Sequence, residues 1–133
     1  MEWIQFSNSL ATASSSYLDY SLLYLESSSG VMLGSVTPTS TTPVMGFAAG
    51  AFVVDKANSS GQTVYLKANL SAIGQNVTVG GHQLGFSITA AGKLKAKGVS
   101  TGSDSTEFLG ATAPNGNTHL MYKALPTVTK LTV

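Results

Sequence analysis

The sequence predicts an all-β fold, a small barrel or sandwich of short antiparallel strands. Runs of strand-favouring residues recur along the chain, and clusters of Gly, Pro, Asn and Ser separate them. That spacing is typical of sandwiches and barrels. Inside several runs, apolar and polar residues alternate with the period of two that leaves a strand with one buried face. A length of 133 residues fits one domain spanning residues 1–133.

The N-terminal segment carries large apolar residues ahead of the main alternating region. Trp3, Phe6 and Leu10 precede a serine run at residues 14–16. Chain ends fray unless something holds them, so a tryptophan at this position indicates an anchor. Two alternatives remain open: a first core strand, or an arm over residues 1–16 that lies in a groove on a partner.

The next segment is predicted to be a strand. The even-numbered residues of Leu18–Tyr24 are apolar or aromatic and share one strand face, and Leu23 and Leu25 make the other face apolar again. We therefore expect a strand that is buried on one side and partly on both. A helix over Leu10–Leu25 is the alternative, because Tyr17, Tyr20 and Tyr24 also have the spacing of one helix face. The serine run and the β-prone tyrosines favour the strand.

The central part of the chain alternates turns and short strands. We expect a turn at Ser27–Gly30, a strand at Val31–Val36 and a loop or extended arm at Thr37–Pro43, whose two prolines cannot hold an interior ladder. The apolar run Val44–Val54 is too short to span a membrane, so we expect a buried strand pair or a strand-like core segment. Thr63–Leu70 alternates, with its even-numbered residues on the core face.

The later segments predict further strands. Gly80 and Gly81 suit the tight turn of a hairpin that continues into Leu84–Ile88. Leu-Gly pairs, such as Leu33-Gly34, place glycine inside a strand, where another chain segment can approach closely. The alternating residues of Thr127–Val133, namely Thr129, Leu131 and Val133, suit pairing with a neighbouring sheet or another protomer.

Three lysines mark the strand near residue 95. Lys93, Lys95 and Lys97 alternate with Leu94 and Ala96, so their ammonium groups project from one face. We expect an edge strand or a solvent-facing strand. Lysines on such a strand usually prevent unwanted strand pairing, and a patch for an acidic partner is the less favoured interpretation.

The composition leaves few groups for chemistry. The chain has no Cys, two His, six carboxylates and seven basic residues that are all Lys, for a net charge of +1. Thiolate nucleophiles and disulfide scaffolds are thereby excluded, and nucleic-acid binding is disfavoured. Charged residues are only 10% of the chain. Removing water from a neutral polar surface costs less free energy than removing it from a charged surface. Such a surface therefore suits burial in a symmetric assembly.

The residues that catalysis would need do not form a recognised pattern. His82 and His119 adjoin predicted turns, and no serine lies in a nucleophile-elbow pattern. Asp104 and Glu107 are closely spaced but lie in a Ser/Thr/Gly loop that matches no calcium-binding loop. We therefore expect no enzyme, no metal and no cofactor. The N-terminus shows no signal peptide, so we expect synthesis in a host cytoplasm.

The stretch GGHQLGFSITAAG, with Leu84-Gly85-Phe86 followed by Ala90-Ala91-Gly92, resembles bacteriophage capsid decoration proteins. The resemblance implies a β-barrel or β-tulip module, often trimeric, that sits at symmetry axes of a head shell and ties capsid subunits together. It covers residues 44–99, and the aromatic N-terminal segment departs from the family pattern.

The resemblance and the composition together predict a viral structural protein on the capsid exterior. We expect it to stabilise a phage capsid by binding the major capsid protein as a homo-oligomer, without binding nucleic acid or membrane. The resemblance implies that this homo-oligomer is a trimer. The alternative is a β-domain of a tail, fibre or baseplate that recognises a cell-surface glycan. The candidate interface residues are Trp3, Phe6, Tyr17, Tyr20 and Tyr24.

Overall fold

A computed structural model confirms the all-β fold. It describes residues 1–8, 16–54, 61–71, 83–89, 92–105 and 116–120. The described strands are antiparallel and form small sheets, none of which closes into a barrel. Of the two predicted architectures, the arrangement is therefore consistent with a small sandwich.

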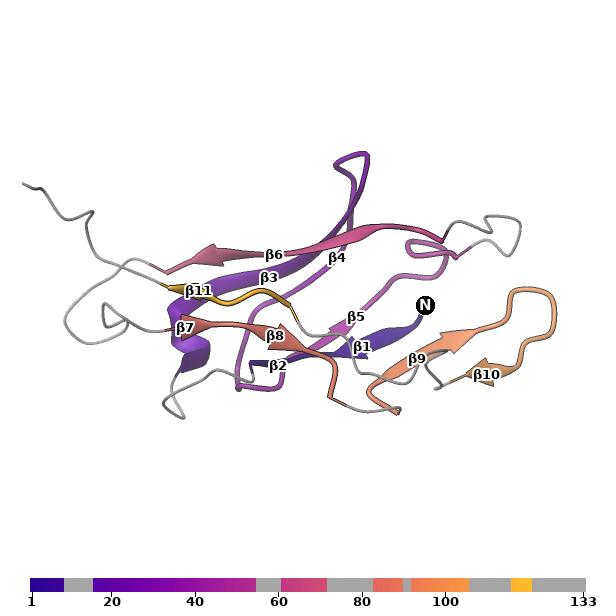
Figure 1. The fold of residues 1–133 in the computed structure, drawn as a ribbon. Helices are drawn as coiled ribbons and strands as arrows, with labels where there is room; N and C mark the ends of the chain where they lie inside the picture. The colour runs from indigo at the N-terminus through magenta and orange to yellow at the C-terminus, as the bar shows by residue number, and fades with distance from the viewer. Residues whose placement is uncertain (9–15, 55–60, 72–82, 90–91, 106–115, 121–133) are drawn as a thin grey trace, which may run out of the picture.

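Two layers enclose the core (Figure 1). One layer is a three-stranded sheet, and the other combines a four-stranded sheet with short strand pairs. The three-stranded sheet has the order β4 (Met32–Val36), β3 (Tyr20–Ser27), β6 (Val64–Leu70). The four-stranded sheet has the order β10 (Asp104–Ser105), β9 (Leu94–Lys97), β1 (Trp3–Gln5), β5 (Val44–Gly46).

Two strand pairs extend the second layer. Strand β2 (Ser7–Asn8) pairs with β8 (Phe86–Ser87), and β7 (Gln83–Leu84) pairs with β11 (His119–Leu120). The buried apolar residues come from both layers and make one cluster: Ile4, Phe6, Tyr20, Leu23, Leu25, Met45, Phe52 and Leu84.

The N-terminal residues occupy the interior of a sheet. Strand β1 lies between β5 and β9, with Ile4 opposite Met45 on one side and Leu94 on the other. The backbone N–H of Phe6 donates to the Pro43 carbonyl at 3.0 Å. Residues 3–8 thus take core-strand positions, and the predicted loop Thr37–Pro43 runs beside them.

A β-bulge changes which face of β3 is buried. Leu70 lies opposite Tyr20, but the adjacent Asn69 lies opposite Leu22, so one extra β3 residue is inserted between the two pairs. After this shift the odd-numbered Leu23 and Leu25 face the core, instead of the even-numbered residues that strict alternation predicts. The strand prediction for Tyr20–Tyr24 and its burial partly on both faces are confirmed, and from Leu23 onward the more buried face is the odd-numbered one.

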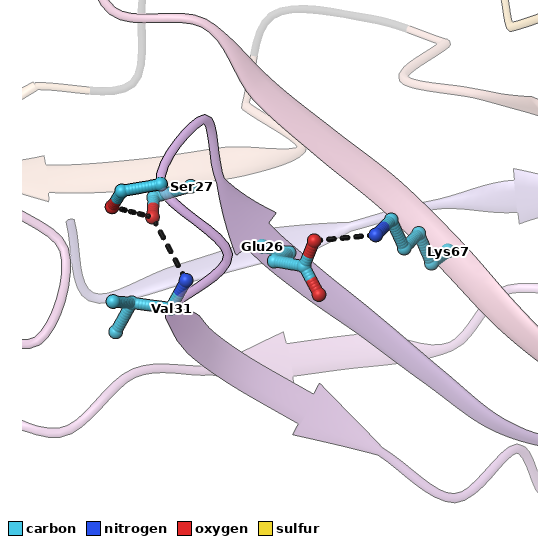
Figure 2. A network of polar contacts seen from close by, with 5 residues as sticks. Glu26, Ser27, Val31 and Lys67 are labelled. Atoms are coloured by element: carbon cyan, nitrogen blue, oxygen red, sulfur yellow. Dashed lines mark hydrogen bonds and ion pairs between the residues drawn. The ribbon is translucent and has the colours of Figure 1, made fainter.

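The turn between β3 and β4 forms where the sequence predicts it. The Gly30 N–H donates to the Ser27 carbonyl at 3.0 Å, and Gly30 has φ +84°. The Ser27 hydroxyl accepts from the Val31 N–H at 3.1 Å, as Figure 2 shows. The turn is therefore held by both backbone and side-chain bonds, and only Gly30 takes the left-handed conformation that glycine favours.

Two sequence expectations need correction. The run Val44–Val54 is not a buried strand pair: β5 ends at Gly46, residues 48–51 form a turn, and Val53 and Val54 are 49% and 58% exposed. The alternative of a strand-like core segment holds for its start at β5 and for the buried Met45 and Phe52. The lysine-bearing strand β9 is not an edge, because β10 covers the side that β1 leaves open. Its solvent-facing lysines are confirmed, since Lys97 is exposed and Lys95 half-buried.

Other expectations fall on residues that the structure does not describe. These are the Gly80-Gly81 hairpin turn and the strand expected within 127–133.

The alternation in β6 is confirmed from Val64 to Ala68, because Val64, Leu66 and Ala68 are half-buried while the residues between them are exposed. It does not extend to Leu70, which is 56% exposed at the end of the strand.

Gly34 allows the two layers to approach each other. A Cβ at this position would lie 2.7 Å from Cδ1 of Phe47, which also packs edge-to-face on Phe52 at a centroid distance of 5.4 Å. At Gly46, by contrast, an added Cβ would meet nothing within 4 Å. The close approach expected of a Leu-Gly pair is thus confirmed at Gly34.

We predict that Gly34→Ala lowers the free energy of unfolding by about 1–3 kcal/mol, because the added methyl group must displace the Phe47 ring. Gly46→Ala is the matched control and is expected to change it by less than about 0.5 kcal/mol. Urea unfolding followed by circular dichroism measures both. Equal effects of the two variants would contradict the packing role of Gly34.

Candidate interaction surfaces

The structure separates the five predicted interface residues into two groups. Phe6 and Tyr20 are core residues, 5% and 1% exposed, and so have almost no side-chain surface left for a partner. Their proposed interface role is incompatible with this fold, because the hydrophobic core already buries them. Trp3, Tyr17 and Tyr24 are half-buried. For these three an interface role stays a prediction.

Of the four candidate catalytic groups, the two that the structure describes lie in different sheets. His119 lies exposed in β11, and Asp104 lies in β10. His82 and Glu107 fall outside the described residues. Within the described part of the chain, no three His, Asp or Glu side chains are grouped so that they could hold a metal ion.

Asp104 has a structural partner instead. Lys95 Nζ lies 2.9 Å from Asp104 Oδ2 and 3.1 Å from Glu2 Oε2, so one ammonium joins residues from β10 and the N-terminal segment. The hydrogen bond to Asp104, followed by that to Glu2, raises the pKa of Lys95. This exposed network links three neighbouring chain segments, and such surface pairs contribute little to stability.

An apolar hollow of about 710 Å³ lies between two turns at one end of the sandwich. We call it the valine hollow, because Val53, Val54 and Val99 are the exposed large apolar residues among its lining. Their exposed fractions are 49%, 58% and 87%. Clustered apolar exposure of this kind marks interaction sites, whereas single exposed residues are ordinary.

Backbone geometry explains why Val99 is so exposed. The Gly98 N–H donates to the Ser103 carbonyl at 2.8 Å, which closes the turn between β9 and β10. The Gly102 N–H donates to the Gly98 carbonyl at 2.8 Å, and Gly102 has φ +67°. Val99 therefore sits at the tip of a hairpin, where no sheet can cover it. Sequence reasoning missed this valine, although its position between two glycines was the available signal.

A second hollow, of about 520 Å³, lies beside β6, and we call it the edge groove. Most of its lining is apolar, with one ammonium and one imidazole. Its lining residues are Tyr24, Leu66, Lys67, Ala68, Leu70, Leu84, Phe86, His119 and Leu120. Aromatic rings are therefore present, while none of the described lining residues carries a side-chain amide.

Tyr20 is a buried polar group at the core. Its hydroxyl has no hydrogen-bond partner among the described residues, and its ring packs edge-to-face on Phe86 at a centroid distance of 5.2 Å. Burial, reinforced by the neighbouring Asp19 charge, raises the pKa of Tyr20 to about 12. The phenol is thus kept neutral and acts in packing.

Comparison of the chain with protein families, curated proteins and solved structures finds no match. Among the described residues, no helix has the length and apolar character needed to cross a membrane. The surfaces above must therefore be interpreted from their own geometry.

We predict that the wild-type protein loses stability between about pH 10 and pH 12, and that Tyr20→Phe abolishes this loss. In the wild type, the unfolded chain releases the Tyr20 proton near pH 10, while the folded chain keeps it until about pH 12. The contribution of Tyr20 to the free energy of unfolding is therefore fully present below pH 10. It falls by up to about 2 kcal/mol as pH rises through this window. Urea unfolding at pH 9, 10 and 11 measures the difference between the two proteins, and identical pH dependences would contradict the prediction.

Proposed function

We propose that this chain is a virion structural protein that decorates and stabilises a phage capsid by binding the major capsid protein as a homo-oligomer. The observation that carries the proposal is the valine hollow, an apolar surface framed by two turns. The connection to a phage head is supported by the sequence resemblance around residues 84–92.

The physical requirements of such a clamp agree with this surface. Fully burying one valine side chain contributes about 1.5 kcal/mol or more, so a few exposed valines can anchor a contact without charged groups. A closed homo-oligomer presents the same surface several times, and each further contact forms at a high effective concentration. Stabilising a shell therefore requires shape and apolar area rather than a catalytic group.

The glycan-binding alternative has weaker support. It calls for a concave site in which aromatic rings stack on sugars and amides read their hydroxyls. The edge groove has Tyr24 and Phe86, but its described lining includes neither Asn nor Gln. Its apolar lining suits a polypeptide better than a sugar.

The first test is the solution mass of the purified protein by light scattering, followed by mixing with undecorated phage heads. The proposal expects a trimer that binds heads up to a saturating copy number. A monomer, or an oligomer that ignores heads, would overturn it and give the glycan-binding alternative first place.

We predict that Val54→Asp weakens this assembly roughly tenfold or more, because a buried carboxylate without a partner is strongly unfavourable. Val31→Asp is the matched control: Val31 is also 58% exposed and lies outside the hollow. Head binding and the oligomer mass from light scattering are measured for both variants. Both quantities should fall for Val54→Asp and stay at the wild-type level for Val31→Asp. If both bind like the wild type, the valine hollow is not the contact surface.

A further inference from the structure

The outer half of the hairpin that carries Val99 has little backbone pairing to hold it. Strand β10 is the outer strand of the described four-stranded sheet (Figure 1) and has only two residues, both exposed. Among the described strands it pairs only with β9, in a register that places Asp104 opposite Lys97. Short, exposed pairings of this kind open locally at a small cost in free energy. Side-chain contacts therefore matter for where the hairpin lies.

The same hairpin forms part of the wall of the valine hollow. Gly98, Val99 and Ser100 line the hollow from the turn between β9 and β10. Glu2 lines it from the N-terminal segment, and Phe52 lines it from the residues that follow β5. The shape of the hollow therefore depends on the position of the hairpin relative to the N-terminal segment.

One ammonium group joins the hairpin to the N-terminal segment. Lys95 lies on β9, and its Nζ contacts both Asp104 Oδ2, at 2.9 Å, and Glu2 Oε2, at 3.1 Å. Backbone bonds already fix Glu2, because its N–H donates to the Lys95 carbonyl at 2.7 Å and its carbonyl accepts from the Phe47 N–H at 2.8 Å. The element whose position the ammonium can decide is therefore β10, which carries Asp104.

Asp104 bonds to Lys95 although another lysine lies directly opposite it. In the strand register the residue opposite Asp104 is Lys97, which forms no ion pair with any described residue. The carboxylate reaches diagonally to Lys95, where Glu2 supplies a second negative charge. A single exposed pair contributes little, and a network of three charges is more effective. Such a network has little influence on global unfolding, but local opening of a two-residue strand responds to small free energies.

We propose that Lys95 acts as a salt-sensitive clasp that holds β10 against the N-terminal segment and keeps the valine hollow in the shape that its partner binds. The side chains of Lys95, Glu2 and Asp104 are 32%, 38% and 50% exposed, so dissolved ions can reach and screen them. Rising ionic strength should therefore release β10 and loosen the hairpin that carries Val99. The proposal rests on the function proposed above for the role of the hollow, whereas the clasp itself can be measured in the isolated protein.

Amide hydrogen exchange followed by NMR tests the clasp without any partner. The reporters are Gly98 and Gly102, whose N–H groups donate within the turn, and the amides of β3 are the reference for global unfolding. In the wild type, raising NaCl from about 20 mM to about 500 mM should lower protection at both glycines roughly threefold or more relative to β3. Lys95→Met keeps the length of the side chain and removes its charge. It should show the lower protection at both salt concentrations.

Lys93→Met is the matched control, because Lys93 lies two residues before Lys95 and forms no ion pair with a described residue. This variant should keep the protection and the salt dependence of the wild type. Asp104→Asn is a second test, and it should resemble Lys95→Met. Protection in the wild type that does not change with salt would overturn the clasp, as would equal protection in Lys95→Met and Lys93→Met.

Head binding by the same variants separates the clasp from the proposed function. Neither Lys95 nor Asp104 is among the described residues that line the hollow, so an effect of either on binding acts through the hairpin. Weaker binding by Lys95→Met than by Lys93→Met would support the proposal. Full binding by Lys95→Met, despite loss of protection at Gly98, would overturn the role of the clasp in the contact. If heads bind no variant and not the wild type, the proposed function fails, while the exchange data still decide whether the clasp exists.

Discussion

One apolar cluster holds the small sheets of this protein together. Ile4 and Met45 come from the four-stranded sheet, Leu23 and Leu25 from the three-stranded sheet, and Leu84 from a short strand pair. A two-stranded unit is marginal in water on its own, and a larger sheet needs a hydrophobic face to be stable. The stability of each unit therefore depends on burying its apolar face against the others, and the turns and surface ion pairs contribute only after that burial.

Because the core cluster stabilises the fold, the apolar residues outside it are free to contact other molecules. Apolar residues that are not needed in the cluster, such as Val53 and Val99, remain exposed at the turns. With few charged groups in the chain, contacts between neutral surfaces are the interactions the molecule is best equipped to make. The valine hollow and the edge groove lie at different elements, so the molecule offers two separate surfaces for such contacts.

Local patterns predicted the strand type, the β3–β4 turn and the alternation of β6, because these features depend on nearest-neighbour geometry. The buried face of β3 could not be predicted, since the bulge beside Tyr20 depends on its register with Leu70 and Asn69. Phe6 and Tyr20 illustrate the related difficulty for sites. Aromatic residues suit cores and interfaces equally well, and only the packing of distant segments decides between the two.

The position of β1 also has a consequence for the order in which the protein is made. This strand is translated before both of its partners, which lie at residues 44–46 and 94–97. Its backbone groups and Ile4 must wait until most of the chain has been translated before they are covered. Such distant pairings slow folding and leave an aggregation-prone strand exposed until its partners have been made. During synthesis, β1 is therefore a segment that a chaperone would protect until residues 94–97 have been made.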